Sequence, residues 1–562
     1  MSRIPAFFYC FILACFLASA STFAQTQYAF RVSFTGKNGT SGTLGAPSAY
    51  LSARALDRRD QQSIAIDSAD LPLSRAYIDT VLSLSSGVLH TRSKWQNNCV
   101  VLMPDTSSMH LVRSKPYVKS AVYVAVFSAP LHLLKANPSD KNTLPESAVK
   151  DRLRTTGTVG YYGDAFDQIR LANGDYLHDR GYRGKGKLIA VLDEGFNLVN
   201  TLPGFDSLRS SGRITDTYNF NLNKAEVYGY SAHGTQVLST MAGILNGSYV
   251  GTAPDADYAL YVTENSSAEQ PFEMDNLVAA MERADSIGAD IITISLGYNT
   301  FTIGTLNADL KLTDIDGKST IAAMGTNTAT QKGILVVASA GNEGGGWWNK
   351  ILTPGDADSA LTCGSVDISK AASPTSGRGP NAAGVRKPDV CMLGAPGIVL
   401  NSSGTTSSVS GTSIATPELA GLAACLWQAY PKANPYQLRK AIRESAHIAS
   451  APNNEQGYGV PDFGKATLSL AETPCICAEP GLTVYPNPFT DALSVEINGA
   501  NSNETLQWSL YNMQGQKILS AARPYTAGSF YFTIPTPQNL PSGIYILRVN
   551  SGQYNQTFKL QK

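Results

Sequence analysis

The sequence predicts an α/β fold, a parallel sheet flanked by helices, preceded by a small α+β domain and followed by a small β-sandwich. Three observations support this prediction. Short β-branched runs alternate with helical segments between residues 155 and 470. Before them come strand-like runs and one segment with apolar residues at helical spacing. After them come segments in which apolar and polar residues alternate, separated by turns. At 562 residues, the chain is also too long for one ordinary core.

The chain begins with a targeting segment. Met1-Ser2-Arg3 supplies a positive charge, an apolar run extends from Phe7 to Leu17, and small residues follow. This layout is typical of a secretory signal peptide, so we expect an exported protein, secreted or held at the cell surface. The predicted parts are a signal peptide (1–24), an α+β domain (25–150), the α/β domain (151–472), a linker (473–481) and a β-sandwich (482–562).

The α+β domain is predicted from its periodicities. Residues 28–34 alternate as a strand does, and residues 73–84 carry apolar side chains at helical spacing. Residues 98–103 and 117–126 are predicted as two further strands. The basic segment 53–59 is interpreted as a surface turn.

The α/β domain contains four apolar segments of strand length. They are rich in β-branched residues, which is typical of strands buried on both faces of a parallel sheet. A helix is predicted over 274–287, between the second and third strands, and completes a βαβ unit. The predicted strands are 188–192, 259–262, 291–295 and 334–339.

The last domain shows period-2 alternation in segments separated by turns such as Pro541-Ser-Gly543. This spacing predicts a small β-sandwich. The predicted strands are 493–497, 506–511, 530–534, 544–549 and 556–560.

The charge balance limits the kinds of partner. The chain has 44 Lys and Arg residues against 44 Asp and Glu residues. With no excess of positive charge to neutralise phosphates, we expect no nucleic-acid partner.

Four segments of the α/β domain each place a reactive side chain at a strand end or a helix start. Asp193 ends the run Ile189-Ala-Val-Leu, and Asn342 follows Val336-Val-Ala-Ser-Ala-Gly. His233 and Ser413 each open a helix rich in small residues.

These four residue types form a complete set for acyl transfer. A Ser hydroxyl needs a base to remove its proton, and a His does this best when a carboxylate fixes its tautomer. The resulting oxyanion needs donors, which a side-chain amide and a backbone N–H at a helix N-terminus supply.

The order Asp193, His233, Asn342, Ser413 resembles the subtilisin-like serine peptidases. Gly-Thr-Ser-x-Ala-Thr-Pro around Ser413 is the most specific motif of that family, and His233-Gly-Thr also matches. The resemblance covers residues 155–470. It implies that Ser413 is the nucleophile, His233 the general base and Asp193 its orienting acid. Asn342 and the Ser413 backbone N–H would stabilise the oxyanion.

The same resemblance implies where a polypeptide substrate binds. The segment Ser295, Leu296 and Gly297 is similar to the subtilase strand that pairs with the substrate backbone. Ala340 and Gly341 are similar to part of the wall of the primary specificity pocket.

One position departs from the family pattern. Glu194 follows Asp193 where the family usually has Ser or Thr, and we expect its side chain to face solvent. No residue is assigned as a metal ligand and no cofactor is expected. Many subtilases hold a structural calcium ion, but the acidic turn Asp314-Ile-Asp316-Gly lacks a closing Glu, because position 325 is Gly.

The flanking domains extend the resemblance. The βαββαβ-like order of residues 28–126 resembles a subtilase propeptide, which would assist folding and inhibit the enzyme through a tail in the active-site cleft. The segments Tyr485-Pro-Asn-Pro-Phe and Gly543-Ile-Tyr-Ile-Leu-Arg-Val are similar to type IX secretion sorting domains. This similarity implies that secretion machinery recognises the C-terminal domain; the alternative is a carbohydrate-binding or adhesive β-sandwich.

Two other functions were weighed for the whole chain. The first is a catalytically silent surface adhesin that kept the fold, against which the intact set of four reactive residues argues. The second is an esterase of the α/β-hydrolase type, which requires a Gly-x-Ser-x-Gly elbow and the chain order Ser, acid, His; both are absent. We therefore expect a secreted serine endopeptidase.

Overall fold

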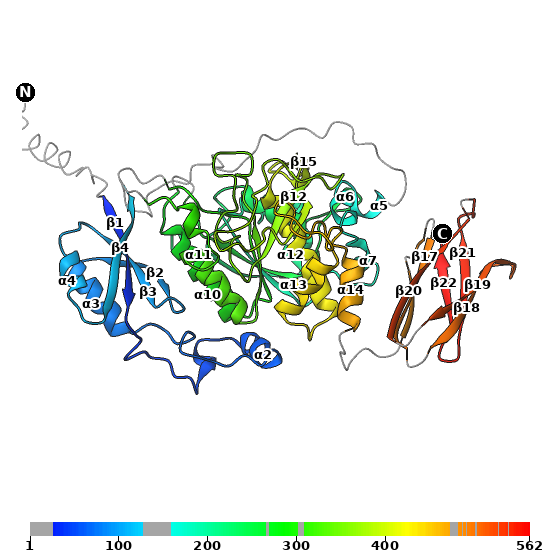
Figure 1. Ribbon diagram of the computed structural model, residues 1–562, viewed down its shortest axis with the longest axis horizontal. Helices are drawn as coiled ribbons and strands as arrows, with labels where there is room; N and C mark the ends of the chain where they lie inside the picture. The colour runs from blue at the N-terminus through cyan, green and yellow to red at the C-terminus, as the bar shows by residue number, and fades with distance from the viewer. Residues whose placement is uncertain are drawn as a thin grey trace, which may run out of the picture.

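Three bodies lie in a row along the long axis of the computed structural model (Figure 1). The structure describes residues 26–127, 159–265, 269–301, 308–472 and 481–562, the last range without positions 486, 490–491, 501–502, 526–527 and 538. The predicted signal peptide lies outside the described residues, as does the predicted linker apart from residue 481. Within the described parts, no helix combines the length and apolarity needed to cross a bilayer.

The N-terminal domain is an antiparallel sheet of strand order β2-β3-β1-β4 with α3 and α4 beside it. The predicted strands and helix of this domain are all present, and β2, an edge strand for which no residues were predicted, completes the βαββαβ order. Its elements are β1 (Gln27–Phe34), η1 (Pro47–Ala49), α2 (Ala53–Gln61), α3 (Arg75–Ser85), β2 (Val88–Ser93), β3 (Asn98–Met103), α4 (Met109–Arg113) and β4 (Val118–Phe127).

The basic segment 53–59 is not the surface turn that its charges suggested. It forms most of α2, in which Ser52 Oγ accepts a hydrogen bond from the Ala55 N–H as a helix cap. Figure 1 shows α2 away from the N-terminal sheet and beneath the central domain. The Arg58 and Arg59 side chains are buried because the Asp285 carboxylate of the central domain pairs with both of them.

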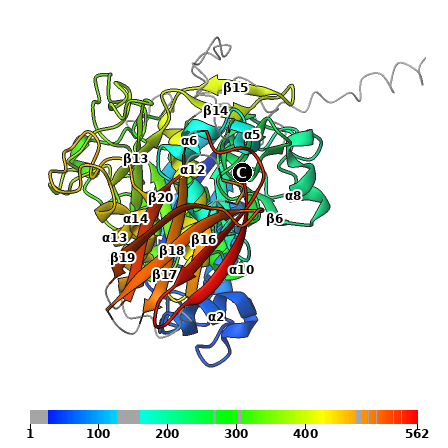
Figure 2. The same cartoon turned by 90° about the vertical axis from the view of Figure 1, so that its right-hand side faces the viewer.

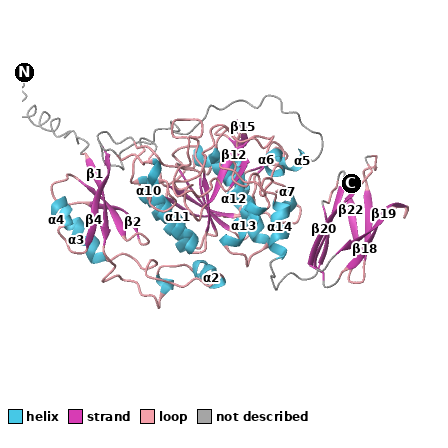
Figure 3. Ribbon diagram, viewed as in Figure 1, coloured by secondary structure: helices cyan, strands magenta, loops and turns pink. Residues whose placement is uncertain are grey.

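The central domain is built on a parallel sheet with strand order β13-β12-β11-β10-β5-β9-β6 in the described part of the chain. Helices flank it on both faces (Figure 3). Its strands are β5 (Leu188–Asp193), β6 (Ile214–Asn219), β9 (Asp257–Val262), β10 (Ile291–Ile294), β11 (Leu335–Ser339), β12 (Leu361–Val366) and β13 (Val390–Leu393). The main helices are α9 (His233–Ala242), α10 (Glu273–Ile287), α11 (Ile321–Gln331), α12 (Thr412–Ala429), α13 (Pro435–Glu444) and α14 (Phe463–Glu472).

Shorter elements complete this domain. They are α5 (Val159–Tyr162), α6 (Phe166–Arg170), α7 (Asp175–His178), η3 (Pro203–Phe205), α8 (Asp206–Ser210), β7 (Ile244–Leu245), β8 (Tyr249–Val250), η4 (Leu312–Asp314), β14 (Gly397–Leu400) and β15 (Thr406–Val409).

The alternate side chains of β5 explain why its sequence is apolar from Leu188 to Leu192. Ile189 and Val191 join the core cluster that includes α9 and α12, whereas Ala190 and Leu192 join the cluster under α10 and α11. Every position of the strand therefore loses its contact with water, and period-2 polarity disappears. The predicted βαβ unit is present as β9, α10 and β10.

The C-terminal domain is the expected β-sandwich, and it faces the viewer in Figure 2. Its two antiparallel sheets have strand orders β16-β17-β20 and β19-β18-β21-β22. Its core cluster draws only on residues from Leu482 to Leu560. Its strands are β16 (Gly481–Tyr485), β17 (Ala492–Ala500), β18 (Glu504–Asn512), β19 (Lys517–Tyr525), β20 (Gly528–Pro535), β21 (Ile544–Asn550) and β22 (Asn555–Gln561).

Candidate active site

The four reactive residues all lie where a strand ends or a helix begins. Asp193 is the last residue of β5, and Asn342 lies three residues beyond β11. His233 is the first residue of α9 and Ser413 the second residue of α12. The carboxyl ends of parallel strands share one edge of a sheet, which is where sites form in such folds. The two helices also pack against each other.

Asp193 and His233 are in direct contact. His233 Nδ1 lies 2.7 Å from Asp193 Oδ1, and both side chains are almost completely buried, at 3% and 0% exposure. Asp193 Oδ1 also accepts the Glu194 N–H at 2.8 Å. A carboxylate in this position holds the imidazole with Nδ1 protonated and stabilises a positive charge on the ring.

The start of α9 approaches β5 closely because it carries glycine. A Cβ on Gly234 would lie 3.0 Å from Asp193 Cβ and 2.3 Å from the Gly195 carbonyl oxygen. Ser231 Oγ accepts the His233 N–H at 3.1 Å and so satisfies a donor at the helix start. Sequence reasoning gave no weight to Ser231, although a serine two residues before a helix start is a capping signal.

The second pair is formed by Asn342 and the start of α12. Asn342 Oδ1 accepts hydrogen bonds from the Thr412 N–H at 2.9 Å and from Thr412 Oγ1 at 3.0 Å. These two bonds fix the orientation of the amide, so that Nδ2 is the group left to donate. A Cβ on Gly411 would lie 3.1 Å from Ser413 Oγ and 3.6 Å from Asn342 Nδ2, so a side chain at this position would crowd the Ser413 hydroxyl.

The residues predicted to bind substrate lie on the segments that continue β10 and β11. Ser295 Oγ donates to the Ser413 carbonyl oxygen at 2.9 Å, which ties this segment to the start of α12. Ser339 Oγ donates to the Leu296 carbonyl oxygen at 3.0 Å and joins the two segments to each other. Gly297, Ala340 and Gly341 complete the pair of segments and lie beside Leu352, a residue that sequence reasoning did not single out.

The prediction that the Glu194 side chain faces solvent is wrong. Its exposed fraction is 3%, because the chain after it folds under the loop that precedes His233. In this loop contact the Phe196 N–H donates to the Val227 carbonyl and the Asn197 N–H to the Ser231 carbonyl. The sequence did not reveal this cover, since the loop has no periodicity.

The acidic turn considered for calcium uses its carboxylates within the turn. Asp314 Oδ2 accepts the Lys311 N–H, and Asp316 Oδ1 accepts the N–H groups of Lys318 and Ser319. A separate group of carboxylates, Glu264, Glu269 and Glu273, has oxygens within 4.8 Å of one another. Glu264 accepts the Tyr298 hydroxyl and Glu273 accepts two backbone N–H groups, so these carboxylates also serve the local structure.

The N-terminal domain contacts α10 of the central domain through charged pairs. Arg31 forms two hydrogen bonds with the buried Asp275 carboxylate, at 2.5 and 2.6 Å. Arg59 bridges Asp70 of its own domain and Asp285 of α10, at 3.1 and 2.8 Å. Bidentate, buried pairs of this kind give a contact with a defined geometry.

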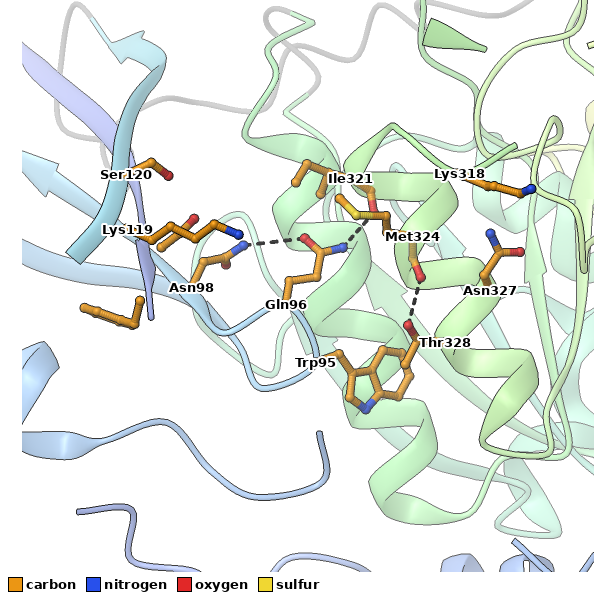
Figure 4. A pocket seen from close by; sticks show the side chains of 12 residues that line it. Trp95, Gln96, Asn98, Lys119, Ser120, Lys318, Ile321, Met324, Asn327 and Thr328 are labelled. Carbon is orange, nitrogen blue, oxygen red and sulfur yellow. Dashed lines mark hydrogen bonds between the residues drawn. The ribbon is translucent and has the colours of Figure 1, made fainter. Parts of the chain in front are cut away.

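A hollow of about 450 Å³ lies farther along the same boundary (Figure 4). Trp95, Gln96 and Lys119 of the N-terminal domain face Lys318 and Met324 of the central domain across it. Gln96 Nε2 crosses the boundary and donates to the Ile321 carbonyl oxygen at 2.8 Å. The hollow therefore belongs to the domain boundary, not to the four reactive residues.

His90 of β2 is buried at this boundary in its neutral form. Asn276 Nδ2 donates to the Thr263 carbonyl. Asn276 Oδ1 therefore faces His90 Nε2 at 3.2 Å and accepts a hydrogen bond from the Nε2–H group. Asn223 Nδ2 approaches His90 Nδ1 at 3.4 Å. A second proton on Nδ1 would face that donor, and burial lowers the pKa of His90 to about 4 from 6.5.

We expect acid to weaken this contact through His90. The pKa of His90 is lower when the two domains are in contact than when they are separated. The stabilisation of the contact by His90 is therefore complete above pH 6.5 and is lost as the pH falls toward 4. Burial raises the pKa of Asp275 and of Glu282, which has the opposite effect on acidification. The contribution of His90 to the pH dependence is therefore obtained by comparing the dissociation of the natural chain with that of His90→Asn at each pH.

The measurement is the dissociation of the N-terminal domain after a cut between residues 128 and 158, followed from pH 7 to pH 4. His90→Asn should bind more weakly at pH 7 and lose less affinity on acidification than the natural chain. His110→Asn, at an exposed histidine of the same domain, is the control and should follow the natural profile. Parallel pH profiles for the natural chain and His90→Asn would contradict this expectation.

Comparison with known proteins places each domain. Residues 184–459 match the subtilase family, residues 29–143 match the Peptidase S8 propeptide domain of Bacteroidota, and residues 483–562 match a secretion system C-terminal sorting domain.

Individual relatives agree with the family match. The chain is 30% identical to subtilisin DY of Bacillus licheniformis over 287 residues, which cover 50% of this chain and 90% of that protein. It is 29% identical over 304 residues to a thermostable alkaline protease of Halalkalibacterium halodurans, covering 53% of this chain and 72% of the relative. Subtilisin Savinase of Lederbergia lenta is 28% identical over 294 residues, which cover 52% and 94%.

Proposed function

This chain belongs to the subtilase family, and we propose that Asp193, His233, Ser413 and Asn342 are the residues through which it hydrolyses peptide bonds. The coarser description follows from the family: the protein is a secreted subtilisin-like serine endopeptidase with a propeptide domain and a secretion sorting domain. The mechanism and the role of each residue are the proposal.

In the proposed mechanism, Ser413 Oγ attacks the carbonyl carbon of the scissile peptide bond while His233 Nε2 takes its proton. The imidazolium is stabilised by Asp193 and then gives the proton to the leaving amine, which leaves an acyl-enzyme. Water, deprotonated by the same imidazole, hydrolyses the acyl-enzyme and restores Ser413. The observation that supports this most directly is the buried contact of 2.7 Å between His233 Nδ1 and Asp193 Oδ1.

The oxyanion is proposed to lie between Asn342 Nδ2 and the Ser413 backbone N–H. Thr412 supports this role. Its N–H and its hydroxyl both donate to Asn342 Oδ1, which orients the amide with Nδ2 on the side away from Thr412. The Ser413 N–H belongs to the first turn of α12, where the helix dipole also favours negative charge.

We expect Asn342→Ala to lower kcat by about 10²- to 10³-fold with little change in KM, a magnitude set by the oxyanion donor of subtilisin itself. Kinetics with a chromogenic peptide measure this. Thr412→Val removes one of the two bonds that orient the amide and should cost less than about tenfold. Equal losses for the two variants would show that the Asn342 amide matters only through its contact with α12.

The N-terminal domain is proposed to inhibit the enzyme until it is removed. The support is its match to the propeptide domain and its buried ion pairs with α10. The predicted inhibitory tail lies outside the described residues. Digestion of casein before and after removal of residues 26–150 tests the proposal. Activity should increase on removal, and an unchanged rate would reject inhibition.

A further inference from the structure

Leu352 lies against two glycines at the ends of neighbouring strands. β10 and β11 are paired with Ile294 opposite Ala338, and the chain continues three residues beyond each of them to Gly297 and Gly341. A Cβ on Gly297 would lie 2.8 Å from Leu352 Cβ and Cδ1. A Cβ on Gly341 would lie 2.5 Å from Leu352 Cγ and 2.7 Å from Cδ1. The leucine side chain therefore fills the space that the two glycines leave open.

This space adjoins the proposed reaction centre. Gly341 directly precedes Asn342, and Ser295, two residues before Gly297, is hydrogen-bonded to the Ser413 carbonyl. The Cα that carries a residue's side chain is bonded to the carbonyl carbon, so a peptide carbonyl held between Ser413 and Asn342 brings the side chain of its own residue close to these two segments. Gly297 and Gly341 are the residues that would otherwise leave room for it.

Leu352 is also held firmly in place. Its N–H donates to the Ala340 carbonyl at 3.1 Å, and its carbonyl accepts the Asp356 N–H at 3.2 Å. Its side chain packs with Ile315, Trp348 and Ile351 and is 7% exposed. A large substrate side chain could enter only by displacing packed atoms, which interiors resist.

We propose that Leu352 sets the cleavage specificity by closing the pocket for the residue on the acyl side of the scissile bond, so that glycine, alanine and serine are accepted there and aromatic residues are rejected. This inference rests on the proposed function. Aromatic side chains would have to occupy the volume that the leucine already fills, whereas a methyl or hydroxymethyl group ends before it.

The first test is the cleavage profile of the mature natural enzyme on a peptide library, followed by kinetics on two peptides that differ only in Ala or Phe at this position. We expect cleavage after small residues and a kcat/KM for Ala at least about 100-fold above that for Phe. This measurement needs no variant.

The second test is Leu352→Ala, which should raise the ratio of kcat/KM for Phe to that for Ala by at least about tenfold. Leu202→Ala is the matched control, since Leu202 is also 7% exposed but belongs to another core cluster, and it should leave the ratio unchanged. A natural enzyme that cleaves efficiently after aromatic residues would overturn the role of Leu352 and leave the proposed function standing. An enzyme that cleaves neither peptide nor casein would remove both.

Discussion

Ser413→Ala is expected to lower kcat on casein and peptide substrates by about a million-fold, a magnitude taken from subtilisin, a relative of this chain. The substitution removes only Oγ, and without it His233 has no hydroxyl to deprotonate and no acyl-enzyme can form. KM should change little, since the segments from Ser295 to Gly297 and from Ala340 to Gly341 remain. Steady-state kinetics on the mature protein measure both quantities.

The fold should survive this substitution. The Ser413 carbonyl, which holds the Ser295 hydroxyl, belongs to the backbone and is unaffected. Circular dichroism and thermal unfolding should therefore match those of the natural protein. Ser407→Ala, at a buried serine of β15, is the control and should keep full activity. A natural protein that is inert after removal of its N-terminal domain would instead support the adhesin.

The strands that carry the site could be predicted from sequence because burial on both faces makes nearly all of their residues apolar. β5, β10 and β11 each have every residue buried. The strands of the small domains that were not predicted, β2, β16 and β19, all lie at an edge of their sheet. Edge position alone does not explain this, because the edge strands β4, β20 and β22 were predicted. In β19 only one of nine residues is buried, so its sequence carries no alternating pattern.

The reactive residues could be identified because each is flanked by a short motif that is local in sequence, and because the four motifs follow one another in a recognisable order. The residues that orient them could not. Thr412 acts through a contact with Asn342, 70 positions earlier in the chain, and Leu352 contacts glycines of two distant segments. Ser231 bonds His233 only two positions later, but no periodic pattern marks it. Glu194 was misplaced for the same reason, since only the folded loop above it shows that it is buried.

Charge was the least reliable guide to exposure. Arg58 and Arg59 were interpreted as solvated, yet both guanidinium groups lie against the Asp285 carboxylate of α10. Burying an unpaired charge is costly, so these arginines can be buried only where a partner carboxylate meets them. The sequence holds both partners, more than 200 positions apart, and gives no sign that they meet.

A chain that ends at residue 480 is expected to fold and cleave casein but to fail to reach the cell surface or the medium. The reason is the separation of the cores: the C-terminal cluster uses residues 482–560, whereas the two main clusters of the central domain use residues from 165 to 470 among the buried side chains that the structure describes. Removing the sorting domain should therefore cost the protease little stability while removing the part that the secretion machinery recognises.

Fractionation of cells expressing the full and shortened chains, with casein digestion by each fraction, measures both effects. Substitutions at two neighbouring positions of β18 test whether delivery requires the sorting domain to be folded or only to be present. Leu506 is fully buried, and Leu506→Asp places a charge in the core of the sandwich, so delivery should be lost as in the shortened chain. Gln507 points outward, and Gln507→Asp should preserve delivery. Normal delivery of the chain ending at 480 would show that the signal for export lies elsewhere and that the β-sandwich serves another purpose, such as adhesion.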